Sequence, residues 1–305
     1  GSTLRTVSAA TGETIWTRDR ISPESLIFGD ELRLSVVSLR NAHCQLFDIR
    51  TGTLLAEHFD IPLNGILATV GTDPIVRQIR SSTHLVSRFD MRSGIPIWEY
   101  ELPGTAMVRP DNGNRLVELH RDGQILIREQ STGSVIIEVQ GQKQLLPGVF
   151  FIHETPTGYV LFTATPQRDF QSQIRPLNLQ GSRQDKVEGS AYGIDGRTGR
   201  LLWTAEIEPQ FFTTSQPRSL PFVVLACQSR RQPAGGFAVP VRSFPIRVLD
   251  TRTGKTLFTA DEDSEVMSFR SEGNEETKQA AITYGTTIVQ LDFSGAKKDP
   301  KPQQD

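Results

Sequence analysis

The chain has 305 residues, a formal net charge of −2 and a pI of about 6.3. This near-neutral charge argues against whole-molecule attraction to nucleic acid or to an anionic membrane. No apolar stretch approaches the roughly 20 residues that a membrane-spanning helix needs. Cys44 and Cys227 are far apart in the sequence and predict two buried free thiols rather than a disulfide framework.

A short motif recurs along the chain and is most complete at residues 192–203. Four of the six gaps between successive motif glycines are close to 40 residues, the length of a four-stranded propeller blade. Between them, short apolar runs alternate with polar residues, as at 33–39 and 124–128, and no helical period is sustained. The sequence therefore predicts an all-β chain. In chain order, the glycines are Gly12, Gly52, Gly94, Gly133, Gly199, Gly254 and Gly295.

Each motif predicts a hairpin in which an apolar strand reaches an aspartate, turns at a glycine and leaves as a second strand. The aspartate accepts hydrogen bonds from turn amides, and the glycine supplies the positive φ of a tight loop. A tryptophan four residues after the glycine suits the gap between neighbouring sheets. These structural roles are assigned to Asp48, Asp90, Asp195, Asp250, Gly52, Gly94, Gly199, Gly254, Trp16, Trp98 and Trp203.

The pattern Asp-x-x-Thr-Gly-x-x-x-Trp resembles the repeat of pyrroloquinoline-quinone (PQQ)-like β-propellers. Asp195, Thr198, Gly199 and Trp203 match it best, and the resemblance spans roughly residues 3–295. It implies a β-propeller of four-stranded antiparallel blades. It also implies a bacterial protein in the periplasm or another extracytoplasmic compartment, as for the propellers of envelope assembly and sensor regions.

The predicted strands number 24, which makes six blades of four. The ring would close by pairing N-terminal strand 13–16 with three C-terminal strands within 266–293. Strand 4–8 is surplus to this count and the chain starts within a repeat, so part of a seven- or eight-bladed ring is the alternative. We expect one propeller domain over residues 1–296. The charged, proline-containing tail at 297–305 is predicted to be disordered.

Two long repeats carry insertions between their second and third strands, at about 165–189 and 228–244. They belong to neighbouring blades, so they should rise side by side on the rim opposite the hairpins. Loops of this length are commonly functional or disordered. Counted as far as Arg247, the two segments carry eight basic and three acidic side chains.

This charge predicts a rim that docks a protein partner with acidic character. The candidate binding residues are Arg175, Arg230, Arg231 and Arg242, whose guanidinium groups can form two-point contacts with carboxylates. Phe237 is a candidate apolar anchor. The alternatives are solvated loop arginines and a phenylalanine that packs back on its own insertion.

Catalytic motifs do not accompany the repeat. The quinone-dependent dehydrogenases that share it hold PQQ beneath adjacent disulfide-linked cysteines and beside calcium, and this chain has no adjacent cysteine pair. It also lacks a His-x-x-x-His pair, a Gly-x-Ser-x-Gly elbow and a phosphate-binding glycine loop. We predict a non-catalytic propeller that binds another protein or recognises a ligand, with no cofactor and no metal site. The alternatives are a PQQ- and calcium-dependent oxidoreductase and a metal-dependent hydrolase or lyase.

Overall fold

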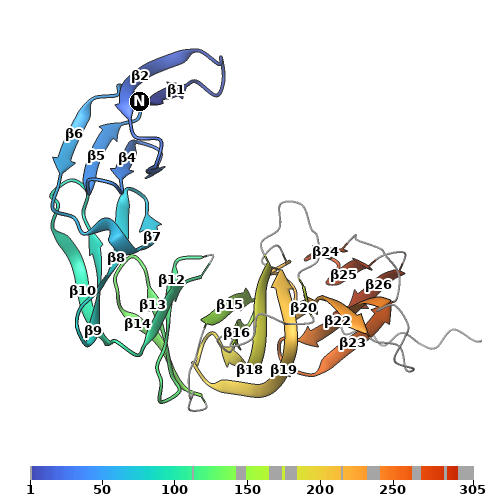
Figure 1. Cartoon of the computed structure of the whole chain (residues 1–305). Helices are drawn as coiled ribbons and strands as arrows, with labels where there is room; N and C mark the ends of the chain where they lie inside the picture. The colour runs from blue at the N-terminus through green and yellow to red at the C-terminus, as the bar shows by residue number, and fades with distance from the viewer. Residues whose placement is uncertain are drawn as a thin grey trace, which may run out of the picture. The chain divides into compact units, whose positions relative to one another are not determined.

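The structure is a computed structural model that describes nearly all of the repeats. Its described residues are 2–111, 113–141, 149–164, 174–175, 184–213, 216–231, 241–262, 269–284 and 287–294. They form 26 β-strands and one short 3₁₀ helix, η1 (Leu63–Gly65). Figure 1 shows the strands arranged in successive sheets along the chain. The chain divides into two compact units, unit 1 (residues 1–120 and 126–136) and unit 2 (residues 121–125 and 137–305). The tail predicted to be disordered lies outside the described residues.

Unit 1 begins with a hairpin of β1 (Ser2–Val7) and β2 (Thr14–Ile21), which are paired antiparallel. Two four-stranded sheets follow, in which each strand pairs with its neighbour in the chain. The first contains β3 (Ser25–Gly29), β4 (Arg33–Ser38), β5 (His43–Asp48) and β6 (Leu54–His58). The second contains β7 (Ile66–Val70), β8 (Asp73–Ile79), β9 (Thr83–Phe89) and β10 (Pro96–Pro103).

A third sheet of the same topology has the order β11-β12-β13-β14. Its strands are β11 (Met107–Pro110), β12 (Arg115–Leu119), β13 (Gln124–Glu129) and β14 (Val135–Gln140). Each of these sheets is an antiparallel meander that continues from one strand to the next through a short turn. This is the topology of a propeller blade.

Unit 2 contains a nine-stranded sheet and a three-stranded sheet of order β24-β25-β26. In the larger sheet, two blades are fused through β19 (Leu201–Thr213), which pairs with β18 (Gln184–Asp195) and, through Phe211 and Phe212, with β20 (Phe222–Ala226). Its other strands are β15 (Val149–Thr155), β16 (Gly158–Ala164), β17 (Ile174–Arg175), β21 (Gln228–Arg231), β22 (Val241–Asp250) and β23 (Thr256–Glu262). The smaller sheet comprises β24 (Phe269–Asn274), β25 (Gln279–Tyr284) and β26 (Thr287–Asp292).

β19 is longer than the second strand of the 192–203 motif requires, because it continues past Trp203 to Thr213. The register explains how it passes Pro209, which has no N–H for the ladder. Gly189 pairs with Ile207 and Val187 with Gln210, so one residue of β18 faces two of β19. This β-bulge accommodates the proline without ending the strand.

The core consists of apolar clusters between successive sheets. In unit 1, Val37 and Leu46 of one sheet pack with Val76 and Phe89 of the next. In unit 2, Phe244, Ile246 and Val248 pack with Ala280 and Ile282 of the three-stranded sheet. Four-stranded antiparallel sheets that bury their faces on neighbouring sheets confirm the predicted all-β blade architecture. The blade number, the ring closure and the single domain over residues 1–296 remain predictions.

Candidate docking site

The repeat hairpins are held by hydrogen bonds to their aspartates. Asp195 Oδ1 accepts from the backbone N–H of Thr198 at 2.6 Å, from its hydroxyl at 2.7 Å and from the N–H of Arg197 at 3.1 Å. These bonds, the Thr198 hydroxyl first, hold the pKa of Asp195 below its usual range. The N–H of Gly199 donates to the Asp195 carbonyl at 2.9 Å. The same carboxylate-to-turn bonds occur at Asp48, Asp90 and Asp250.

The tryptophans each contact the hairpin of the following repeat. Trp203 Nε1 donates to the carbonyl of Thr251 at 2.8 Å, and its ring covers Gly254 so closely that a Cβ there would lie 2.6 Å from it. Trp16 and Trp98 make the same contacts to the next repeats, with Gly52 and Gly133 beneath their rings. Each indole ring therefore lies against the hairpin of the next repeat. Where the tryptophan is lacking, His58 covers Gly94 and Ile137 covers Gly199.

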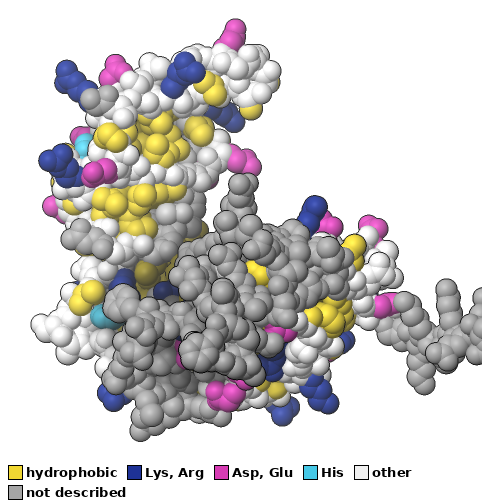
Figure 2. All heavy atoms as spheres, turned by 45° about the vertical axis from the view of Figure 1, so that its right-hand side comes forward, with side chains coloured by type: hydrophobic (Ala, Val, Ile, Leu, Met, Phe, Trp, Pro, Cys, Tyr) yellow, Lys and Arg dark blue, Asp and Glu magenta, His cyan; other side chains and the backbone are white. Residues whose placement is uncertain are grey.

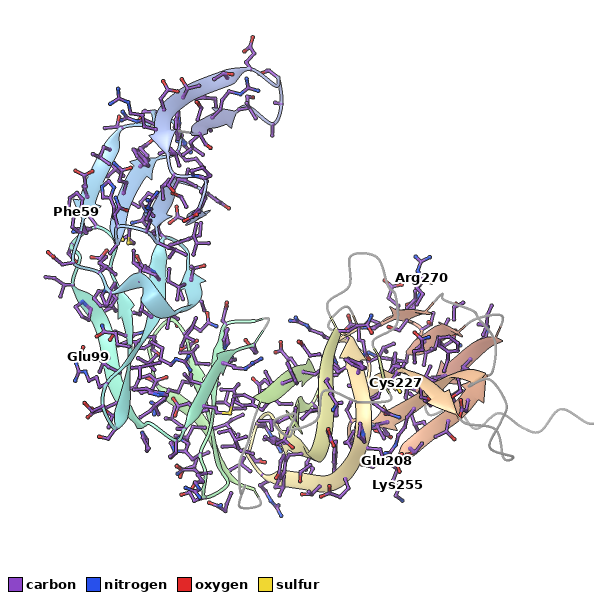
Figure 3. The ribbon with its side chains drawn as sticks, viewed as in Figure 1. Phe59, Glu99, Glu208, Cys227, Lys255 and Arg270 are labelled. Atoms are coloured by element: carbon purple, nitrogen blue, oxygen red, sulfur yellow. The ribbon has the colours of Figure 1, made fainter. Side chains whose placement is uncertain are left out.

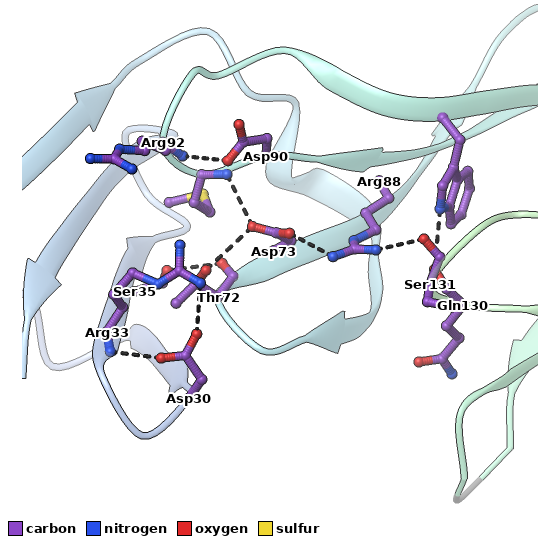
Figure 4. A network of polar contacts seen from close by, with 12 residues as sticks. Asp30, Arg33, Ser35, Thr72, Asp73, Arg88, Asp90, Arg92, Gln130 and Ser131 are labelled. Carbon is purple, nitrogen blue, oxygen red and sulfur yellow. Dashed lines mark hydrogen bonds and ion pairs between the residues drawn. The ribbon is translucent and has the colours of Figure 1, made fainter.

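A polar network joins three sheets of unit 1 near these hairpins (Figure 4). The Ser35 hydroxyl donates to the Thr72 carbonyl at 2.9 Å, and the Thr72 hydroxyl donates to Asp73 at 3.3 Å. Arg88 donates to Asp73 at 2.7 Å and to the Ser131 carbonyl of the following sheet at 2.6 Å. Both members of the ion pair are largely buried. The network therefore links sheets and is structural.

Sequence reasoning missed a buried ionic cluster in unit 1. Glu118 is fully buried, and its carboxylate accepts from Arg128 Nε at 2.6 Å and lies 3.4 Å from His120 Nε2. The Arg128 guanidinium lies over the Tyr100 ring, 4.1 Å from its centroid. Burial, and next the Glu118 charge, raise the pKa of Tyr100. The sequence does contain one sign of this cluster, which is a charged residue within an apolar strand. A charged group that is buried there needs a partner.

The two long insertions lie side by side, as the sequence predicted. β17, from the first insertion, pairs with β21, from the second, through Ile174 opposite Ser229 and Arg175 opposite Gln228. β21 continues the pairing onto β22. We call this assembly of β17, β21 and the start of β22 the insertion sheet. Residues 184–189, expected in the first insertion, belong to β18 instead.

The strand register shows which of the candidate arginine positions share a face of the insertion sheet. Arg230 is directly opposite Arg242, and Arg175 is opposite Gln228, two residues before Arg230. Because opposed and alternate residues share a face of a pleated sheet, positions 175, 230 and 242 lie on one face. Arg231, opposite Val241, occupies the other face. Phe237 lies outside the described residues.

The two cysteines are buried in the described structure. Cys44 and Cys227 are buried free thiols, as predicted, and burial raises the pKa of each to about 11. Figure 3 shows Cys227 within unit 2 and Arg270 pointing away from β24. Among the described residues, no three His, Cys, Asp or Glu side chains are grouped to hold a metal, and no helix has the length and apolarity to cross a bilayer.

Two clefts open on the described surface. The larger, of about 790 Å³, lies over the three-stranded sheet and is lined mainly by polar residues, among them Gln216, Glu272, Asn274, Gln279, Gln290 and Asp292. The smaller, of about 300 Å³, lies in unit 1 between β2 and the β3–β6 sheet. Figure 2 shows Lys and Arg interspersed with Asp and Glu over the visible surface, with apolar side chains exposed between them.

Neither a protein-family model nor a curated protein matches the chain. Among solved structures, it is similar to BamB from Moraxella catarrhalis, with 12% identity and a TM-score of 0.40 over 97% of this chain and 78% of that one. It is also similar to a europium-containing methanol dehydrogenase, with 10% identity and a TM-score of 0.42 over 95% and 74%. A third similar structure is Kuenenia stuttgartiensis hydrazine synthase, with 15% identity and a TM-score of 0.38 over 90% and 78%.

Proposed function

We propose that this protein is a non-catalytic binding propeller that docks an acidic segment of another protein on the insertion sheet. The observation that carries the proposal is the register that puts positions 175, 230 and 242 on one face. We call these three positions the arginine face. The blades supply a rigid base, and the insertions supply the contact, as is usual for loops that carry function on a scaffold.

The register of the arginine face puts two arginines at opposed positions of a strand pair. Arg230 and Arg242 are directly opposed on neighbouring strands. Like charges at opposed positions destabilise a sheet, whereas an opposite charge between them stabilises it. Carboxylates of a partner would neutralise these arginines, and each guanidinium can bind a carboxylate through two parallel hydrogen bonds. An acidic segment is therefore the partner chemistry that fits best.

The titratable groups of the blades favour binding over catalysis. Glu118 is paired with Arg128, and His153 packs in an edge-to-face contact against Phe212 at 5.3 Å. Neither of these buried groups lines one of the two clefts. These two buried groups therefore contact neighbouring strands and lie away from both clefts.

The test is binding of a fluorescent peptide rich in glutamate and aspartate, followed by anisotropy at several salt concentrations. We expect saturable binding that weakens as salt rises, because exposed charge pairs are screened. Arg230→Glu with Arg242→Glu should weaken it by about tenfold or more, since a charge-assisted contact contributes roughly 1.5–3 kcal/mol.

The matched control is Arg50→Glu with Arg92→Glu, which reverses the same number of charges on the exposed repeat hairpins. This control should retain the wild-type affinity. Equal loss of affinity in both double variants would mean that only net charge matters and would contradict a specific arginine face. Unchanged affinity in the insertion-sheet variant would overturn the proposal outright.

A further inference from the structure

The smaller cleft of unit 1 is lined by polar and apolar side chains, among them two arginines and one acid, Asp19. It lies between β2, the outer strand of the first hairpin, and the β3–β6 sheet, and it is open to solvent with a volume of about 300 Å³. This space holds a small polyatomic anion with some of its water. The polar lining residues used below are Arg18, Arg20, Ser38, Asn41, His43 and Gln45.

Comparison of the repeats shows that Arg18 replaces a packing residue. The position six residues after the repeat glycine is occupied by Arg18, His58, Tyr100, Val139, Ala205 and Ala260 in successive repeats. Tyr100 and Ala260 pack into the apolar clusters between sheets, and Val139 is buried. Among these six repeats, only the first has a permanently charged group at this position. A guanidinium cannot lose its proton, so it must be solvated or paired with an anion.

The Arg18 guanidinium is positioned by the following repeat. Its Nη2 donates to the Gly52 carbonyl at 3.1 Å, and its Cζ lies 5.4 Å from the centroid of the Phe47 ring. With the described residues this is its one hydrogen bond, and the guanidinium has five N–H donors. The remaining donors are therefore available to a ligand in the cleft.

Arg20 supplies the second cation. Its backbone has a φ of 65°, a left-handed conformation that is uncommon for a residue with a side chain. It forms no hydrogen bond or ion pair with any residue that the structure describes. Strained backbone of this kind is found most often at functional sites, where contacts with the surrounding structure hold it in place.

The acidic groups near the cleft already have partners. Glu57 Oε1 accepts from Gln45 at 2.9 Å and lies 2.7 Å from His43 Nε2. The His43 ring stacks on Phe59, with centroids 4.5 Å apart; Figure 3 labels Phe59. Asp19 Oδ1 accepts from the Thr3 hydroxyl at 2.9 Å. Glu57 is thus paired with His43, whereas Asp19 keeps its negative charge, so among the residues that line the cleft the two arginines outnumber the acids by one.

We infer that this cleft binds a phosphate group, held between Arg18 and Arg20, with Ser38 and Asn41 as neutral donors. Each guanidinium is a planar fork of donors that matches two oxygens of a phosphate. The bound group would join β2 to the β3–β6 sheet in place of the apolar contact that other repeats use at this position. This site is in unit 1, whereas the proposed docking surface is in unit 2. An experiment can therefore contradict one proposal without contradicting the other.

The test is isothermal titration of the whole chain with inorganic phosphate at low ionic strength, with O-phosphoserine and acetate in parallel. We expect phosphate to bind and acetate to bind at least tenfold more weakly. Arg18→Gln and Arg20→Gln should each weaken phosphate binding by about tenfold, and Arg50→Gln should not change it. Tighter binding of phosphoserine than of phosphate would identify a phosphorylated partner as the source, and the reverse would identify the free ion.

Equal phosphate affinity in the wild type and in Arg20→Gln would overturn the inference, as would phosphate binding lost equally in Arg50→Gln. Arg20 is exposed and makes no described polar contact, so its replacement should leave the fold intact. A circular-dichroism melt of each variant checks this. Phosphate should raise the melting temperature of the wild type and not that of the Arg18→Gln, Arg20→Gln double variant, because a ligand that binds only the native state stabilises it.

Discussion

His153 is a buried histidine without a hydrogen-bond acceptor or donor for its Nε2 among the described residues. Its side chain is almost completely buried on β15, beside Phe212 of β19. Burial, and to a lesser extent the charge of Arg218, lowers its pKa to about 4. The native state therefore holds this ring neutral, at a pH where an unfolded chain would protonate it.

This histidine makes stability depend on pH. Between the unfolded pKa of about 6.5 and the native value of about 4, the unfolded state binds a proton that the native state does not. The free energy of unfolding should therefore fall as pH drops through this window, by up to roughly 3 kcal/mol, and His153 should add nothing further below it. In His153→Phe this contribution disappears, so urea unfolding should give a flatter pH profile than the wild type. Parallel profiles for the two proteins would contradict the assignment.

At the scale of residues, the sequence predicted the repeated positions better than the isolated ones. Asp195 and Trp203 were identified because the repeat presents each role several times. The bonds of Asp195 are local to its turn, whereas Trp203 donates to Thr251 in the next repeat. Glu118 and Arg18 were missed. The partners of Glu118 include Arg128 on the next strand, and Arg18 becomes distinct only when it is aligned with Tyr100 and other packing residues. Such contacts depend on register between strands, which a single sequence does not specify.

At the scale of elements, the hairpin glycines serve two purposes that substitution can separate. Gly254 has a φ of +69°, and a Cβ there would lie 2.6 Å from the Trp203 ring. Gly12 has a φ of +72°, and a Cβ there would meet nothing within 4 Å. The first therefore combines a backbone requirement with a packing requirement, and the second has the backbone requirement alone.

We predict that Gly12→Ala lowers the free energy of unfolding by about 1 kcal/mol, the cost of a left-handed alanine. Gly254→Ala should cost about 2–4 kcal/mol, because the tryptophan must also move. Urea denaturation of both variants, with tryptophan fluorescence as the probe, measures the difference. Equal losses would show that the close contact with Trp203 carries no energy.

The strands that the sequence did not predict are those formed by long-range pairing. β17 and β21 fall in segments interpreted as insertions, where arginine, glutamine and proline interrupt any alternation of apolar residues. Their pairing joins residues more than 50 positions apart, so no local pattern indicates it. β1 is also additional to the 24 predicted strands. It corresponds to the surplus strand at residues 4–8, and it pairs with β2. Conversely, β19 takes the place of two predicted strands, the last strand of one blade and the first strand of the next.

At the scale of the whole molecule, the two cysteines report separately on the two units. Cys44 is buried in unit 1 and Cys227 in unit 2. Thiols buried in this way react only when the surrounding structure opens. In a repeat architecture, stability is carried by contacts between neighbours, so a local defect should open its own region first.

We predict that Trp203→Phe, which loses the hydrogen bond to Thr251, speeds labelling of Cys227 by a thiol reagent by about tenfold and leaves Cys44 unchanged. Trp16→Phe should do the reverse, because its indole donates to Ile49 in unit 1. Peptide mapping of the labelled protein over time distinguishes the sites. Equal acceleration of both cysteines by either variant would show that the chain opens as a single cooperative body.

β19 also limits how this chain can be altered by recombination. It is the outer strand of one four-stranded set and, through Phe211 and Phe212, the inner strand of the next. Excision of either repeat would cut β19 and leave backbone groups of the other repeat without their strand partners. Residues 149–262 must therefore be inherited, duplicated or transplanted together, whereas the separate sheets of unit 1 have no such shared strand.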